Sequence, residues 1–307
     1  MTPAPTSAAT VGALVEELAR ALAARQITEP FSEAREIVAA LFDVPRSWPM
    51  LNGTAEVEVE MGGRARRAAD LRAHGAPLAY AVGRASFRHL TLDVDERVLI
   101  PRPETEQLVD LVLDALNDDR DARAHDARET TGVAIDVGTG SGAIALSLAA
   151  EGRFSRVYGT DISRGALEIA RRNVTLCAPV LRAPVELLHG SLLAPLLDVR
   201  ATVVVSNPPY IALSEAESLP RSVRDWEPPV ALYGGADGMT PTARLVRQAA
   251  DVLAPGGLFA IEVDARRAGL AAELVSRERR FAAVRVELDL TGRERFVLAR
   301  RQARGTG

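Results

Sequence analysis

The residues Asn207, Pro208, Pro209 and Tyr210 follow an apolar run, Ala201–Ser206, that is rich in β-branched side chains. Such a run fits a central parallel strand that is covered on both faces. Proline cannot donate to a sheet ladder and restricts the preceding residue to extended backbone, so we expect Asn207 to be held stiffly at the carboxyl edge of the sheet. Open α/β sheets bind their ligands at that edge.

This corner carries groups that suit an amino group on planar carbon. The side chain of Asn207 offers a carbonyl acceptor, and Pro208 adds a main-chain carbonyl without an N–H of its own. Tyr210 supplies an aromatic face for a flat amide or base. Asn-Pro and Pro-Pro are also ordinary turn signals, so these residues alone support a turn and a receptor for an –NH2 group about equally.

From Gly132 the sequence alternates strand, loop and helix, which predicts a doubly wound α/β sheet with helices on both faces. The last two strand-like runs could form an antiparallel hairpin at the edge of this sheet. Strands are expected at 133–137, 157–160, 185–189, 203–206, 258–263, 284–290 and 295–299, and helices at 143–150, 164–176, 241–253 and 266–279.

A small all-α domain is expected over residues 1–76. Its first helix has Thr10 as a plausible N-cap, because apolar residues follow at helical spacing. Ser32 could cap a second helix that ends before Pro45, and a third runs from residue 58 to 74.

Residues 77–103 are expected to link this domain to residues 104–307. Within the linker, 87–92 and 94–100 alternate like the arms of a β-hairpin, with the turn near Asp93. A helix then runs through Leu116, and residues 117–131, which lack apolar periodicity, are expected to form an exposed loop.

A glycine-rich loop follows the first strand of the alternating region, directly after Asp136. Glycine is needed where a loop takes unusual dihedral angles and a ligand approaches the backbone closely. Asp161 ends the second strand about 20 residues farther along, where a carboxylate can accept both hydroxyls of a ribose. A tight turn and an N-cap are the structural alternatives, but the two features on consecutive strands favour a nucleoside site. The loop residues are Gly138, Thr139, Gly140, Ser141 and Gly142.

Composition limits the other classes. The chain has 307 residues, which leaves room for two domains or one large one, and 47% hydrophobic with 25% charged residues is typical of a globular protein. It has no apolar stretch long enough to span a bilayer and no signal-peptide pattern at its start, so we expect a cytoplasmic protein without a membrane partner. Cys177 stands alone and the four histidines are scattered, so no metal site is expected. The formal charge of −4 disfavours a nucleic acid as the main partner.

The residues resemble the HemK/PrmC family of glutamine methyltransferases, which modify peptide chain release factors. The G-x-G-x-G loop after Asp136 is similar to that of methyltransferases that use S-adenosylmethionine. Asn207–Tyr210 also occurs in enzymes that methylate base amines, whereas Pro101–Glu106 is far more specific to this family. The similarity extends over nearly the whole chain, through Tyr80 and Gly83, Val98–Glu106, Asp136–Ala145, Ser206–Ile211, Glu227-Pro228 with Ala231-Leu232, Asp237-Gly238 and Asp289–Arg295.

The resemblance implies a Rossmann-like, class I methyltransferase domain and an N-terminal helical domain that helps to dock class I release factors. It implies that Gly138–Gly142 and Asp161 hold S-adenosylmethionine, with Asn207 beside the methyl donor. Asn207–Tyr210 would bind the glutamine amide of the Gly-Gly-Gln motif, with Asn207, Pro208 and Tyr210 as the catalytic residues. The product would be N5-methylglutamine, with nucleic acid not a substrate.

Two departures from the family pattern bear on the site. The acidic-aromatic pair that the family places beside the adenine corresponds to Ser191 and Leu192 here, so Leu192 becomes the candidate adenine contact. Glu262-Val263-Asp264 replaces a Glu-His-Gly or Glu-Ile-Gly segment.

The main alternative is an exocyclic-amine methyltransferase for DNA or RNA, which the net charge and Pro101–Glu106 disfavour. A non-catalytic nucleoside-binding protein and a nicotinamide dehydrogenase fit less well. The first would not need an intact Asn207 corner, and the second uses a different glycine spacing.

Overall fold

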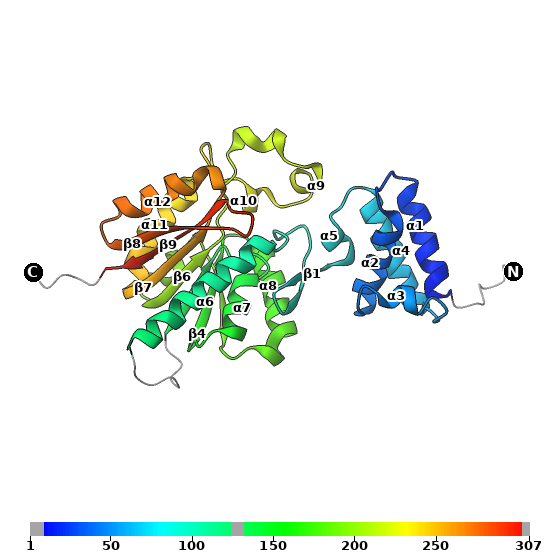
Figure 1. The fold of residues 1–307 in the computed structure, drawn as a ribbon, viewed down its shortest axis with the longest axis horizontal. Helices are drawn as coiled ribbons and strands as arrows, with labels where there is room; N and C mark the ends of the chain where they lie inside the picture. The colour runs from blue at the N-terminus through cyan, green and yellow to red at the C-terminus, as the bar shows by residue number, and fades with distance from the viewer. Residues whose placement is uncertain (1–8, 124–131, 303–307) are drawn as a thin grey trace, which may run out of the picture. The chain divides into compact units, whose positions relative to one another are not determined.

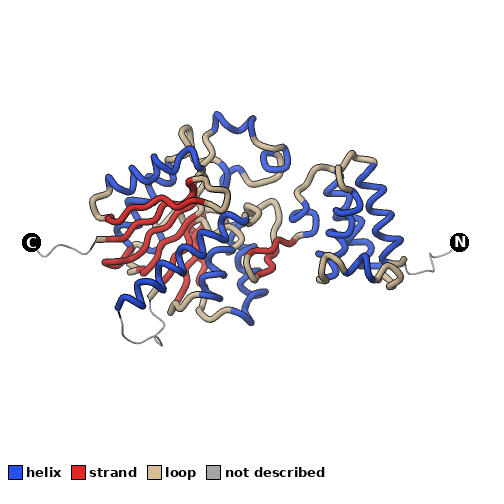
Figure 2. Tube along the Cα trace, viewed as in Figure 1, coloured by secondary structure: helices blue, strands red, loops and turns tan. Residues whose placement is uncertain are grey.

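The computed structural model describes residues 9–123 and 132–302. These residues divide into two compact units. The first contains the chain up to Arg84 together with Pro220–Trp226, and the second contains Ala85–Leu219 and the chain from Glu227 onward. Figure 2 shows helices alone in the N-terminal part and a large sheet in the second unit.

The first unit is a bundle of helices around a core of small and branched apolar side chains. Thr10 caps the first helix by accepting a hydrogen bond from the Ala13 amide at 3.3 Å, as predicted. Fully buried Leu14, Leu18 and Ile37 form the centre of the core. The helices are α1 (Val11–Ala23), α2 (Pro30–Phe42), α3 (Trp48–Leu51), α4 (Val59–Ala73) and α5 (Leu78–Val82).

A seven-stranded sheet forms the centre of the second unit, with the strand order β5-β4-β3-β6-β7-β9-β8 (Figure 1). The first five strands in this order are parallel, and β9 runs antiparallel to both β7 and β8, so the predicted edge hairpin is present. The strands are β3 (Val133–Val137), β4 (Arg156–Asp161), β5 (Val185–His189), β6 (Ala201–Ser206), β7 (Leu253–Glu262), β8 (Phe281–Leu288) and β9 (Glu294–Arg301).

Helices cover both faces of this sheet, because successive side chains of a strand point to opposite sides. In β6, Val203 and Val205 belong to the core beneath α6 and α7, whereas Val204 belongs to the core beneath α11 and α12. All three are fully buried, which is why the strand is apolar throughout. The helices are α6 (Pro103–Arg123), α7 (Ala143–Glu151), α8 (Arg164–Cys177), α11 (Thr240–Val252) and α12 (Ala268–Arg277).

The segment between β6 and α11 contains only short helices. Glu215 anchors it by accepting the Ala212 amide at 3.0 Å and the Arg267 guanidinium at 2.8 Å. The short helices are η3 (Leu213–Ser218), α9 (Arg221–Arg224) and α10 (Pro229–Leu232); η1 (Ala178–Val180), η2 (Ala194–Leu196) and η4 (Ala265–Arg267) lie elsewhere in the chain.

A two-stranded hairpin is present in this region, but both predicted arms were wrong, because residues 94–100 form no strand. Its strands are β1 (Arg84–Phe87) and β2 (Leu90–Asp93), so the turn lies at Arg88 and His89 rather than near Asp93. Arg88 adopts the left-handed conformation, with φ of 53°. Its guanidinium binds Glu151 through two 2.7 Å contacts, and this tertiary ion pair holds a turn that its residue types do not favour.

Two further predictions were wrong at helix ends. Ser32 lies inside α2, which begins at Pro30 because proline is favoured in a first helical turn. The helix expected to end at Leu116 continues to Arg123, so residues 117–123 are helical rather than a loop. Residues 124–131, the rest of the predicted loop, lie outside the described residues.

Candidate active site

The glycine loop after β3 exposes its backbone. Gly138, Gly140 and Gly142 have φ values of 74°, 54° and 87°, which other residues adopt only with strain. A Cβ atom built on Gly138 or Gly140 would meet no heavy atom within 4 Å. A Cβ on Gly142 would lie 3.2 Å from the Leu146 side chain. The first two glycines thus leave open space above the loop, whereas the third allows close packing of α7.

Asp136 supports this loop from below. Its Oδ2 accepts the Thr139 hydroxyl at 2.6 Å and the Ala145 amide at 3.1 Å, which ties the loop to the start of α7. Burial raises the pKa of Asp136 to about 7, against the two hydrogen bonds, which lower it. Among the described residues, its buried Oδ1 has no partner. Such an orphaned acceptor at the base of an open loop suits a site completed by a ligand.

Asp161 connects the end of β4 to the same loop. One carboxylate oxygen accepts the Gly140 amide at 2.9 Å, and the other accepts the Ser163 amide at 2.8 Å. Burial raises the pKa of Asp161 above its ordinary value. Ser163 is the N-cap of α8, since its hydroxyl accepts the Ala166 amide at 3.1 Å. Asp161 is therefore not the N-cap, and its carboxylate retains lone-pair capacity for a ligand.

Asn207 stands at the end of β6, as its sequence predicts. The preceding Ser206 hydroxyl donates to the Val137 carbonyl at 2.6 Å, which fixes the strand end against β3. The Asn207 amide donates through Nδ2 to the Thr105 hydroxyl at 3.0 Å. Pro208 is buried, and burial raises the pKa of the Tyr210 phenol above its ordinary value, so this side chain is neutral at physiological pH.

A cavity of about 290 Å³ brings both halves of the predicted site together. Its wall contains six of the residues singled out from the sequence: Gly138, Gly140, Asp161, Leu192, Asn207 and Pro209. Pro208 and Tyr210 belong to the same corner but not to this wall. Thr139 and Ser141, which belong to the glycine loop, are buried and are not part of this wall.

The position of Leu192 in the wall depends on an unusual backbone. Leu192 has a φ of 53°, in the left-handed region that disfavours a leucine. The next residue, Leu193, is fully buried, and its amide donates to the Gln248 side chain at 3.0 Å. This anchor holds the turn in which Leu192 and Ser191 contribute to the wall.

Sequence reasoning missed nearly two thirds of the residues in this wall. Arg97 lies there with its guanidinium bound to Asp95 at 2.6 Å and to Glu168 at 2.8 Å. Most of the missed residues belong to loops and helix starts without a motif of their own. Only Val98 and Leu99, within the Val98–Glu106 match, and Ala231 carried a signal of family resemblance. They are Arg97, Val98, Leu99, Ile162, Ser163, Ala166, Val230, Ala231, Tyr233, Thr240, Pro241 and Arg244.

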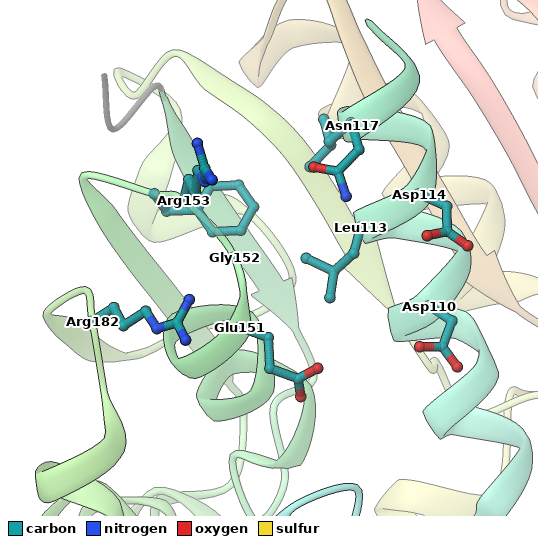
Figure 3. A pocket seen from close by; sticks show the side chains of 10 residues that line it. Asp110, Leu113, Asp114, Asn117, Glu151, Gly152, Arg153 and Arg182 are labelled. Carbon is teal, nitrogen blue, oxygen red and sulfur yellow. The ribbon is translucent and has the colours of Figure 1, made fainter. Parts of the chain in front are cut away.

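A second cavity, of about 360 Å³, contains none of the predicted site residues. Figure 3 shows Asp110 and Asp114 on α6 on one side of it, with Arg153, Arg182 and Glu151, at the end of α7, on the other. Its wall contains both acidic and basic side chains. Among the described residues, no glycine loop and no buried acceptor without a partner is part of this wall. The first cavity is the better candidate for an active site.

Other site types find no support in the described residues. Within 9–123 and 132–302, no three His, Cys, Asp or Glu side chains are grouped so as to hold a metal ion. In the same ranges, no helix is both long and apolar enough to cross a membrane.

The doubly wound sheet is Rossmann-like, and the glycine loop and Asp161 lie at the carboxyl edge of its strands, where this fold binds its ligands. A family model described as "Methyltransferase small domain" matches residues 120–219, and one described as "PrmC N-terminal domain" matches residues 13–83. The hMettl16 catalytic domain, solved with the MAT2A 3′UTR hairpin 6, shares the fold at a TM-score of 0.53 and 15% identity, covering 80% of this chain and 82% of that one.

The curated relatives are more specific. A "Release factor glutamine methyltransferase" of Moorella thermoacetica is 38% identical over 93% of this chain and 96% of its own length. Proteins of the same name from Deinococcus radiodurans, 37% identical over 90% and 92%, and Streptomyces coelicolor, 36% identical over 94% and 98%, match similarly. The chain belongs to the release factor glutamine methyltransferase family, as the sequence resemblance predicted.

Proposed function

We propose that this protein transfers a methyl group from S-adenosylmethionine to the side-chain amide nitrogen of the glutamine in the Gly-Gly-Gln motif of class I peptide chain release factors. The observation that carries this proposal is that the Asn207 amide lines the same cavity as Gly140 and Asp161. An acceptor for a planar amide thus stands beside a loop suited to a nucleoside. Family membership supplies the substrate class.

The residues present fit S-adenosylmethionine. The open backbone at Gly138 and Gly140 gives room for close approach, and the spare lone pairs of Asp161 suit ribose hydroxyls. Asp136 offers a buried acceptor without a partner among the described residues. Leu192 contributes an apolar surface that suits the adenine. When bound, this cofactor supplies an electrophilic methyl group on a sulfonium.

The chain's own contribution to the reaction is orientation. An amide nitrogen is a poor nucleophile because its lone pair is delocalised into the carbonyl. The Asn207 Oδ1 and the Pro208 carbonyl oxygen would each accept a hydrogen bond from one N–H of the substrate amide. The lone pair of the substrate nitrogen would then point at the methyl carbon. Positioning of this kind accounts for large rate gains, and both acceptors favour the positive charge that develops on nitrogen. The nitrogen loses one proton after transfer, and no strong general base is needed.

The helical unit supports a protein substrate. The "PrmC N-terminal domain" match covers residues 13–83, so residues 1–76 are assigned to docking of the release factor, and the activity belongs in the cytoplasm with the translation machinery. Nucleic acid is not expected to be a substrate, because the formal charge is −4 and the family acts on protein.

The test is to incubate the protein and radiolabelled S-adenosylmethionine with a release factor, with the same factor carrying Ala in place of the Gly-Gly-Gln glutamine, and with bulk RNA and DNA. Label is expected in the intact factor alone. Asn207→Ala should abolish transfer while cofactor affinity, measured by calorimetry, changes little. Label in nucleic acid but not in the release factor would overturn the proposal in favour of a base-amine methyltransferase.

A further inference from the structure

Three side chains from distant parts of the chain form a line of hydrogen bonds beneath the candidate acceptor site. Glu262 is the last residue of β7, Thr105 lies in the first turn of α6, and Asn207 follows β6. The Thr105 hydroxyl donates to Glu262 Oε2 at 2.7 Å, and Asn207 Nδ2 donates to the same hydroxyl oxygen at 3.0 Å. Thr105 and Glu262 are 5% and 1% exposed, so water competes little for these bonds.

The direction of each bond in this line follows from the group at its end. An ionised carboxylate can only accept, so Glu262 takes the single hydroxyl hydrogen of Thr105. The Thr105 oxygen then has only lone pairs left for Asn207, and the Asn207 amide must turn its NH2 group toward it. Its Oδ1 is the atom left for a substrate, which removes the two-fold ambiguity of an asparagine side chain.

The charges around Glu262 set its pKa and therefore the pH at which the direction of these hydrogen bonds is fixed. Burial raises the pKa of Glu262 to about 7, and Glu104 raises it further, whereas the Thr105 hydrogen bond, Arg295 and Arg102 lower it. The Tyr210 phenol, whose pKa is raised by burial and by Glu262, stays neutral at this pH. A protonated Glu262 can donate to Thr105 and release the fixed direction of the line. The direction is therefore enforced above about pH 7 and relaxed below it.

We propose that Thr105 and Glu262 are positioning residues that hold the Asn207 amide with its oxygen toward the substrate nitrogen. The inference rests on the proposed function, because it assigns Asn207 as the acceptor of the glutamine N–H. It gives a physical role to part of the Pro101–Glu106 segment, which the mechanism above leaves unused. A flipped Asn207 would present a donor to a donor and repel the substrate amide.

The matched variants are Thr105→Val, which removes the hydroxyl at nearly constant shape, and Thr105→Ser, which retains it. Methyl transfer to the release factor is measured in single turnovers at saturating cofactor, beside the cofactor affinity by calorimetry. Thr105→Val is expected to lower the transfer rate by about 100-fold, the scale of a misplaced reacting group, with the cofactor Kd changed less than about threefold. Thr105→Ser should stay within about fivefold of the unchanged protein.

The pH profile separates positioning from a merely structural role. In the unchanged protein the transfer rate should rise through about pH 7, and Glu262→Gln should flatten this rise because the side chain no longer titrates. Thermal unfolding of each variant shows whether it folds; if Thr105→Val does not, the serine variant and the Glu262→Gln profile decide. Thr105→Val at near-unchanged rate, or an unaltered profile in Glu262→Gln, would overturn the inference. Absence of release factor methylation by the unchanged protein would instead count against the proposed function.

Discussion

The carboxylate of Asp161 accepts the main-chain N–H of Gly140 at 2.9 Å, which joins the end of β4 to the loop after β3. The two motifs singled out in the sequence are therefore one structure rather than two neighbouring ones. The bond holds the Gly140 backbone in its left-handed conformation, with φ of 54°. A ligand that enters the cavity meets a loop that is already ordered, so the loss of conformational entropy that opposes binding is small.

Gly140→Ala is expected to weaken cofactor binding by about tenfold or more, because the added methyl group enters the cavity and such crowding costs about 1–3 kcal/mol. The matched control is Gly292→Ala in the turn between β8 and β9. Gly292 also has a positive φ, 80°, and open space around a built Cβ, but it does not line the cavity. Both variants should lose about 1 kcal/mol of unfolding free energy. Calorimetry with S-adenosylmethionine checks the difference; equal affinity losses would contradict this assignment.

Arg88→Ala should destabilise the second unit by about 2 kcal/mol or more, since it leaves Glu151 and the Glu106 carbonyl without a strong donor. Arg88 is 11% exposed and also binds Asp110 at 2.8 Å. Arg156→Ala is the control: its pair with Glu186 at 2.6 Å leaves the two side chains 46% and 45% exposed, so little or no change is expected. Urea denaturation followed by circular dichroism measures both. A loss for Arg88→Ala no larger than for Arg156→Ala would refute the anchoring role.

Much of the second unit follows from the sequence because local signals and tertiary packing agree there. Val133–Val137 is apolar apart from Asp136, its end is marked by the glycine loop, and the observed β3 has the predicted bounds. The position of the hairpin turn does not follow from the sequence, since the turn at Arg88 depends on Glu151, 63 residues away. The hydrogen bonds that orient Asn207 depend on Thr105, which is 102 residues away, so no local sequence pattern could place the two side chains together.

Asp136→Asn should change how stability depends on pH. Burial raises the pKa of Asp136 to about 7, whereas an unfolded aspartate titrates near pH 4. The folded state thus holds this proton more tightly: its contribution to stability is complete below about pH 4 and is lost as the pH rises through about 7. Relative to the unchanged protein, Asp136→Asn should gain unfolding free energy between about pH 4.5 and about pH 8, by up to a few kcal/mol. Urea titrations at both pH values measure the gain, and parallel curves for the two proteins would contradict it.

Asn207→Asp should lower the transfer rate by about 100-fold or more, although the new side chain still has acceptor oxygens. The hydroxyl of Thr105 donates to Glu262, so its lone pairs would face a second carboxylate and push it out of place. Single-turnover transfer measures the loss, with calorimetry to show that the cofactor still binds.

Glu262→Gln in the Asn207→Asp background should recover part of this loss, because the hydrogen bonds of the line can reverse together. The amide introduced at position 262 would donate to the Thr105 oxygen, and the Thr105 hydroxyl would then donate to the carboxylate introduced at position 207. The other oxygen of that carboxylate would remain for the substrate. We expect the double variant to transfer methyl about tenfold faster than Asn207→Asp alone, whereas Glu262→Gln by itself slows the unchanged protein. Recovery of this kind requires coupling through Thr105, so Thr105→Val in the double variant should remove it. Additive losses in the double variant would show that the three side chains act independently.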